Sequence, residues 1–194
     1  MTVPKQGRAW SVGRGAERTL VVLASLAVAI GVIALLSGGL LAGRDSPGIS
    51  GAGAGPGTSF PDQGHARLSP GQLQPVYNSD PPTSGPHIPE PIVRDRAQLS
   101  DYQLLQGLEV GDVILMYGTR RPPAGLSAMA AAVAPPFTPA LAAAGGAVVL
   151  AHRPGTRGVV ALAWTRMLRV ASARDPALRG FAQFWLGRGD PHAG

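Results

Sequence analysis

The stretch GDVILMYG, residues 111–118, decides the fold. Its middle, Val113–Tyr117, is a short run that is apolar at every position, which is typical of a central strand of a sheet. Gly111 and Asp112 before the run, and Gly118 after it, are residues that punctuate regular structure. The sequence therefore predicts a strand over residues 113–117.

Further elements follow this strand along the chain. Residues 126–133 are rich in alanine and predict a short helix, and residues 139–144 predict one further helical turn. Residues 147–151 and 159–164 are apolar and predict two more strands. Residues 154–156 (PGT) supply turn chemistry between them, so we expect these two strands to form a hairpin.

The last predicted element is a helix with clear signals at both ends. Asp175 is a good N-cap, Pro176 suits the first helical position, and Gly187 can end the helix. The large apolar side chains between them fall on one helical face: Leu178, Phe181, Phe184 and Trp185. The order strand, helix, strand, strand, helix predicts an α+β fold, a small two-layer domain with a mixed sheet over residues 76–194.

The N-terminal region carries a separate apolar segment. Residues 19–43 include no charged side chain, and the stretch from Leu20 to Leu41 has about the 20 residues that a helix needs to cross a bilayer. Basic residues precede it, and an Arg–Asp pair that cancels in charge follows it, so the positive-inside rule places the N-terminus in the cytoplasm. We therefore predict a basic cytoplasmic stub (1–18) and one transmembrane helix (19–43) in the cytoplasmic membrane.

A cleaved signal peptide is the alternative for this segment, because Ala42 is a small residue near a plausible cleavage point. The apolar stretch is longer than the roughly 7–15 residues usual in signal peptides, and Leu40 is too bulky for the cleavage pattern. The preferred interpretation is an anchor in the lipid bilayer with the C-terminal domain outside.

Residues 44–75 carry glycine, proline, serine and alanine with almost no large apolar side chains. Such a segment buries too little surface to offset the entropy lost on ordering. We expect a disordered linker between the membrane helix and the outer domain.

The amino-acid composition excludes several classes of function. The 194-residue chain contains no cysteine, which excludes disulfide scaffolds, thiolate nucleophiles and Cys-containing zinc sites. Its net charge of +6 reflects the basic stub and the scarcity of acids more than a basic face. We therefore predict no nucleic-acid partner.

One histidine stands in a stiff segment, YNSDPPTSGPHIP, residues 77–89. Prolines lower the entropy lost when a side chain is held in place, so His87 could serve as a ligand or a proton carrier. The alternative is a rigid surface loop with an ordinary imidazole.

Four motifs together resemble a bacterial single-pass membrane family of unknown function. They are PPTSGPH (81–87), LEVG (108–111), LAWTRMLRV (162–170) and GRGDP (187–191), of which PPTSGPH is the specific one. The resemblance covers roughly residue 76 to the C-terminus. It implies the same plan of basic stub, membrane helix, Gly/Pro-rich tether and outer domain.

In that family the segment before the first strand resembles H-x-L-E-H-G, which together with His87 implies three imidazoles and a carboxylate. Imidazole nitrogens are good donors to zinc and copper. His87 and Glu109 match this pattern, whereas Gln106 and Val110 stand at the other two histidine positions. The resemblance therefore implies a histidine site that is degraded in this chain.

A rebuilt metal site is the alternative. His152 follows the second strand, and a sheet that brought it beside His87 and Glu109 would form a two-His, one-carboxylate site for zinc or copper. The simpler interpretation of His152 is a surface residue beside a turn. Without that rebuilt site we expect no cofactor.

Two further patterns are weaker. Asp80, Ser84 and His87 include the residue types of a nucleophilic triad, but they share one proline-rich loop and no G-x-S-x-G elbow exists. The tripeptide at residues 188–190 (RGD) is of the adhesion type, and it arises readily by chance in a Gly-rich tail.

We therefore expect a single-pass membrane protein that displays a non-catalytic domain outside the cytoplasmic membrane, as an envelope or interaction module with an envelope protein as partner. The alternative is a zinc- or copper-binding protein that uses His87, Glu109 and His152.

Overall fold

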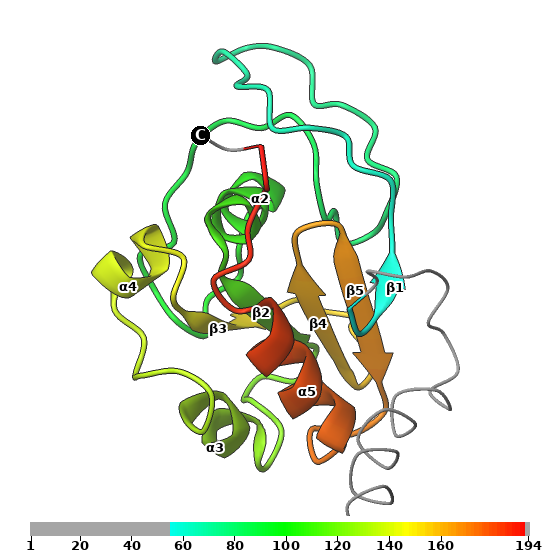
Figure 1. The fold of residues 1–194 in the computed structure, drawn as a ribbon, viewed down its shortest axis with the longest axis vertical. Helices are drawn as coiled ribbons and strands as arrows, with labels where there is room; N and C mark the ends of the chain where they lie inside the picture. Colours follow the sequence, from blue (N-terminus) through cyan, green and yellow to red (C-terminus); the bar gives the residue numbers. More distant parts are fainter. Residues whose placement is uncertain (1–54, 193–194) are drawn as a thin grey trace, which may run out of the picture. The chain divides into compact units, whose positions relative to one another are not determined.

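A computed structural model describes residues 55–192, which form a mixed α+β domain around a five-stranded sheet (Figure 1). The strands are β1 (Thr58–Ser59), β2 (Val113–Tyr117), β3 (Val148–His152), β4 (Val159–Ala163) and β5 (Arg166–Val170). Their order across the sheet is β1-β5-β4-β2-β3. β2 and β3 run parallel and every other neighbouring pair is antiparallel, so the sheet is mixed as predicted.

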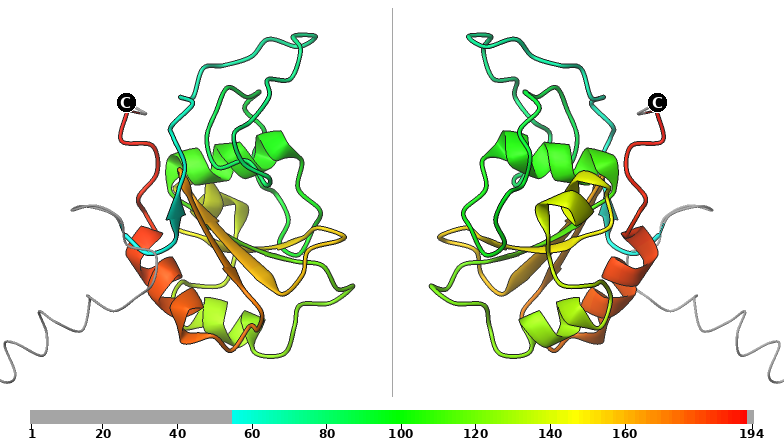
Figure 2. Two further views of the ribbon diagram at one scale, coloured as in Figure 1. Left: turned by 90° about the vertical axis from the view of Figure 1, so that its right-hand side faces the viewer. Right: turned by 90° about the vertical axis from the view of Figure 1, so that its left-hand side faces the viewer.

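Helices cover both faces of this sheet (Figure 2). They are α2 (Asp101–Val110), α3 (Leu126–Ala131), α4 (Pro139–Ala143) and α5 (Pro176–Trp185). α3 and α5 pack with Val113, Leu115 and Tyr117 of β2, whereas α2 and α4 pack with Ile114 and Met116 from the opposite face. The predicted two-layer arrangement is therefore wrong: the sheet lies between two helical layers, which is why β2 is apolar at every position.

Helix α2 is the one helix of the described residues that the sequence prediction left out. Ser100 caps it by accepting a hydrogen bond from the Gln103 N–H, while the Gln103 side chain accepts one from the Ser100 N–H. This is a capping box, and Gly111 ends the helix in a left-handed conformation at φ 114°. Leu104, Leu105 and Leu108 fill the core on this side of the sheet.

The predicted hairpin between the second and third strands is also wrong. β3 and β4 do not pair with each other, because β2 lies between them and pairs with both. The tight hairpin joins β4 to β5 through Trp164 and Thr165, with Thr165 at a positive φ of 57°. β5 is absent from the predicted order, since its Arg-rich sequence is only partly apolar.

The folded region begins earlier than residue 76. Within the segment expected to be a disordered linker, Thr58 and Ser59 pair with β5, the Phe60 N–H donates to the Thr165 carbonyl, and Arg67 bridges to His87. Backbone hydrogen bonds to strands and loops order residues 55–75, so an apolar core of their own is not needed.

The predicted membrane helix (19–43) and the stub (1–18) lie outside the described residues. Within residues 55–192 no helix is both long enough and apolar enough to cross a bilayer.

Candidate functional site

The PPTSGPH segment lies inside the domain. Thr83, Ser84 and His87 are fully buried, so the interpretation as a surface loop is wrong. The Thr83 carbonyl accepts a hydrogen bond from the Thr165 N–H at 2.9 Å, and the Ser84 hydroxyl accepts one from the Gln63 N–H at 3.0 Å. The motif thus ties the β4–β5 hairpin to the incoming chain and fixes His87 in place.

Tyr77 braces the same segment. Its hydroxyl donates to the Pro86 carbonyl at 2.9 Å, and burial raises the pKa of Tyr77 to about 12, with the nearby Tyr102 and Asp101 adding to the shift. The phenol therefore keeps its proton, and this bond, across the physiological range.

Helix α2 supplies the second part of the site. Gln106, Glu109 and Val110 stand at i, i+3 and i+4, and residues at this spacing share a helical face. The Glu109 carboxylate is 4% exposed and lies with its Oε2 atom 3.1 Å from His87 Nε2. The structure thus brings His87 and Glu109 together.

Arg67 completes the site. Its Nη1 and Nη2 donate to the two Glu109 oxygens, each at 2.7 Å, in a bidentate pair. Nη1 also lies 3.0 Å from His87 Nε2 and 3.3 Å from the Gln106 Oε1 atom. One guanidinium therefore contacts three of the four positions at which the family resemblance implies metal ligands.

The hydrogen-bond partners assign the His87 tautomer. Nδ1 lies 2.9 Å from the Gly85 carbonyl oxygen, which can only accept, so Nδ1 carries the hydrogen. Nε2 lies 3.0 Å from Arg67 Nη1, which can donate to its lone pair, and 3.1 Å from Glu109 Oε2. Both ring nitrogens are used, and so are both oxygens of Glu109.

This arrangement is a closed polar cluster. A guanidinium stays charged at all physiological pH values and has no acceptor, so Arg67 neither relays a proton nor leaves a lone pair for a ligand. It neutralises a buried carboxylate, which would otherwise be costly to hold inside the protein.

Residues 72–194, which include this motif and α2, match the family described as "Protein of unknown function (DUF3105)". The chain belongs to this family. No curated protein and no solved structure matches the chain. Arg67 precedes the matched DUF3105 region, so the cation of the site comes from the segment in front of the family domain.

His152 lies elsewhere in the DUF3105 domain. Its ring lies beside Tyr117, with the ring centroids 5.8 Å apart, and its backbone N–H donates to the Ala97 carbonyl at 2.9 Å. In the part of the chain that the structure describes, no three His, Cys, Asp or Glu side chains gather as a metal site would require. His152 does not join His87 and Glu109.

The two weaker sequence patterns, the triad residues and the RGD tripeptide, do not form the sites that their residue types suggested. The Asp80 carboxylate pairs with Arg153 at 2.6 Å, while Ser84 bonds to backbone, so Asp80, Ser84 and His87 form no triad. The RGD tripeptide packs against α2: Asp190 is buried, its N–H donates to the Glu109 carbonyl at 2.9 Å, and its carboxylate contacts His65. It is therefore not presented for adhesion.

Arg67 is the site residue that sequence reasoning missed. It lies 42 positions before Glu109 in a Gly/Pro-rich stretch, with no motif around it. The only signal was Glu109 among the leucines and valine of residues 104–110, because a buried carboxylate demands a cationic partner without saying which residue supplies it.

Proposed function

We propose that this chain is a non-catalytic binding module, anchored by one N-terminal helix and displayed outside the cytoplasmic membrane, whose degraded histidine site is closed by Arg67. The observation that carries the proposal is the bidentate Arg67–Glu109 pair with His87 Nε2 at 3.0 Å from the same guanidinium. A reaction centre needs a free acid, base or ligand, and this cluster offers none.

Zinc or copper binding is the second candidate, and the His87–Glu109 contact of 3.1 Å is what favours it. The donor set does not fit such an ion. Transition-metal sites in proteins usually take three or four ligands, whereas only one imidazole and one carboxylate converge here, and both are bonded to Arg67. Gln106 and Val110 supply no imidazole.

A metal titration separates the two functions. Zinc and copper are titrated calorimetrically into the full chain in detergent, beside the variant His87→Ala. The non-catalytic module predicts no stoichiometric binding by either protein. Tight binding by the unaltered chain that disappears in His87→Ala would overturn it in favour of metal binding.

The location is tested by cysteine labelling, for which the cysteine-free chain is a clean background. Leu73, which is 93% exposed, is replaced by Cys in the outer domain, and Ser11 is replaced by Cys in the N-terminal stub. A membrane-impermeant maleimide added to spheroplasts should label Leu73→Cys, and should label Ser11→Cys only after the membrane is opened. The reverse pattern, or equal labelling, would contradict the proposed topology.

A further inference from the structure

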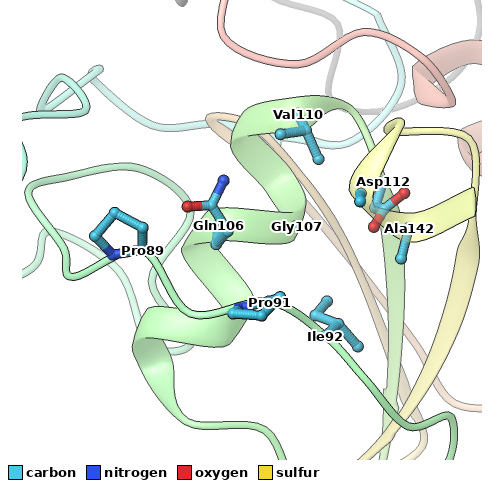
Figure 3. Close-up of a pocket in the computed structure, with 9 residues that line it drawn as sticks. Pro89, Pro91, Ile92, Gln106, Gly107, Val110, Asp112 and Ala142 are labelled. Atoms are coloured by element: carbon cyan, nitrogen blue, oxygen red, sulfur yellow. The ribbon is translucent and has the colours of Figure 1, made fainter. Parts of the chain in front are cut away.

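A cavity of about 230 Å³ opens between α2, α4 and residues 89–92 (Figure 3). α2 contributes Gln106, Gly107 and Val110, and the proline-rich segment runs beside the helix. The remaining lining residues are Pro89, Pro91, Ile92, Asp112, Ala142 and Ala143. The wall is therefore apolar except for one amide and one carboxyl group.

Asp112 is the ionisable residue of this lining and is 1% exposed. Its Oδ1 atom accepts a hydrogen bond from the Ala147 N–H at 2.8 Å, while Oδ2 is buried and has no hydrogen-bond partner. A buried oxygen without a partner is costly, and native structures seldom leave one. A ligand that brings a hydrogen-bond donor would remove that cost.

The position of Gly107 brings Oδ2 close to the cavity. A Cβ atom on Gly107 would lie 3.5 Å from Asp112 Oδ2 and 2.7 Å from Ile92 Cδ1, and Ile92 lines the cavity. The missing side chain therefore lets Ile92, a residue of the cavity wall, pack against α2 beside the unpartnered oxygen.

The local charge favours a cation. Asp112 follows the C-terminal end of α2, where the helix dipole is negative, and no basic residue occupies the last turn. Arg67, which contacts Gln106 of the same helix, is balanced by Glu109. Burial raises the pKa of Asp112 to about 7, so a substantial fraction of the carboxyl group is ionised at neutral pH, when a cation would pair with it.

The volume limits the size of the ligand. A cavity of roughly 150 Å³ takes up benzene, and pockets for drug-sized ligands start at about 300 Å³. The cavity beside Asp112 lies between these sizes. It suits one ring, or an equivalent aliphatic body, with a short polar arm.

We propose that this cavity binds a small apolar amine, with the apolar body against α2 and α4 and the ammonium group bonded to Asp112 Oδ2. This site goes beyond the proposed function and does not depend on it, since Arg67, His87 and Glu109 are not among the lining residues.

The experiment uses 2-phenylethylamine as probe and 2-phenylethanol as its neutral analogue, titrated into the full chain in detergent at pH 8. Binding is read from the backbone amide signals of Gly107, Asp112 and Ala147 in ¹H–¹⁵N spectra. Asp112→Asn removes the charge and keeps the Oδ1 acceptor for Ala147. Asp175→Asn is the matched control, because it removes one carboxylate at the N-cap of α5, where Asn caps equally well.

The amine should shift these signals saturably and bind at least tenfold more tightly than the alcohol. Asp112→Asn should abolish that tenfold preference, and Asp175→Asn should keep it. Gly107→Ala, whose Cβ would collide with Ile92 and displace it into the cavity, should weaken amine binding at least threefold. No saturable shift with the amine, equal affinity for amine and alcohol, or an unchanged preference in Asp112→Asn would overturn the proposal.

Discussion

Glu109 is almost fully buried, and its charge is tolerated because Arg67 binds both of its oxygens. Removing one partner of a buried ion pair leaves an uncompensated charge and costs about 3–5 kcal/mol. The Arg67 side chain is 47% exposed, so water screens part of this interaction. The net contribution of Arg67 should therefore lie below that range.

We predict that Arg67→Ala lowers the free energy of unfolding by roughly 2 kcal/mol. Arg67→Lys should recover only part of the loss, because an ammonium group cannot form the two parallel bonds. The double variant Arg67→Ala/Glu109→Gln should be more stable than Arg67→Ala alone, since it removes the orphaned charge. Urea unfolding followed by tryptophan fluorescence measures all three, and an Arg67→Ala protein as stable as the unaltered chain would refute this account of Glu109.

The buried Asp112 carboxyl group makes the stability of the domain depend on pH. Its pKa rises from 3.8 to about 7 on folding, so the folded state holds this proton more tightly than the unfolded state. Stability is therefore lost as the pH rises from about 4 to 7. Asp112→Asn does not titrate, and its stability relative to the unaltered chain should increase by roughly 2–3 kcal/mol between pH 5 and pH 8. Urea unfolding at the two pH values checks this, and a constant difference would contradict the buried carboxyl.

Among the elements, α2 positions both the closed cluster and the cavity, and its C-terminal end depends on Gly111. That residue has a φ of 114°, and a Cβ there would lie 3.0–3.2 Å from backbone atoms of Gly187 and Arg188. The C-terminal tail packs here, with the Gly187 N–H donating to the Gly111 carbonyl at 2.9 Å.

Two glycine substitutions test this role. Gly111→Ala should lower the free energy of unfolding by roughly 2 kcal/mol, because alanine is strained in this conformation and meets the tail backbone. Gly180→Ala in α5, where a Cβ would meet no atom within 4 Å, should raise it by about 0.5–1 kcal/mol. Thermal unfolding of both variants decides the matter, and similar effects on both would mean that Gly111 is not a structural cap.

The helices and strands that were predicted correctly are those with clear local signals in the sequence. β2 is confirmed at its predicted residues, and α5 begins at Pro176 with Asp175 as N-cap because both signals are local. β5 was missed because its turn, Trp164-Thr165, lacks the glycine or asparagine that usually marks a two-residue hairpin. α2 was missed although its Ser100–Gln103 capping box was visible, since the interior Gly107 lowers helix propensity.

Over the whole molecule, one omitted helix accounts for the wrong number of layers. Without α2, only the short helical turn predicted at residues 139–144 is left to cover the face of β2 that carries Ile114 and Met116, and a two-layer domain follows. The pairing of Arg67 with Glu109 could not be predicted at all, because it depends on how a segment 42 residues away crosses the end of α2. His87 and Glu109 could be paired only through the family resemblance.

The central claim is that Arg67 closes the His87–Glu109 site, and the histidine rings report on it most directly. Two-bond ¹H–¹⁵N spectra of the full chain in detergent, recorded without and with equimolar zinc, give the tautomer of each ring, and the variant His87→Gln assigns the His87 signals. The account predicts that His87 carries its hydrogen on Nδ1 and that zinc leaves its Nε2 signal unchanged. A His87 Nε2 signal that moves to a zinc-bound position would contradict it.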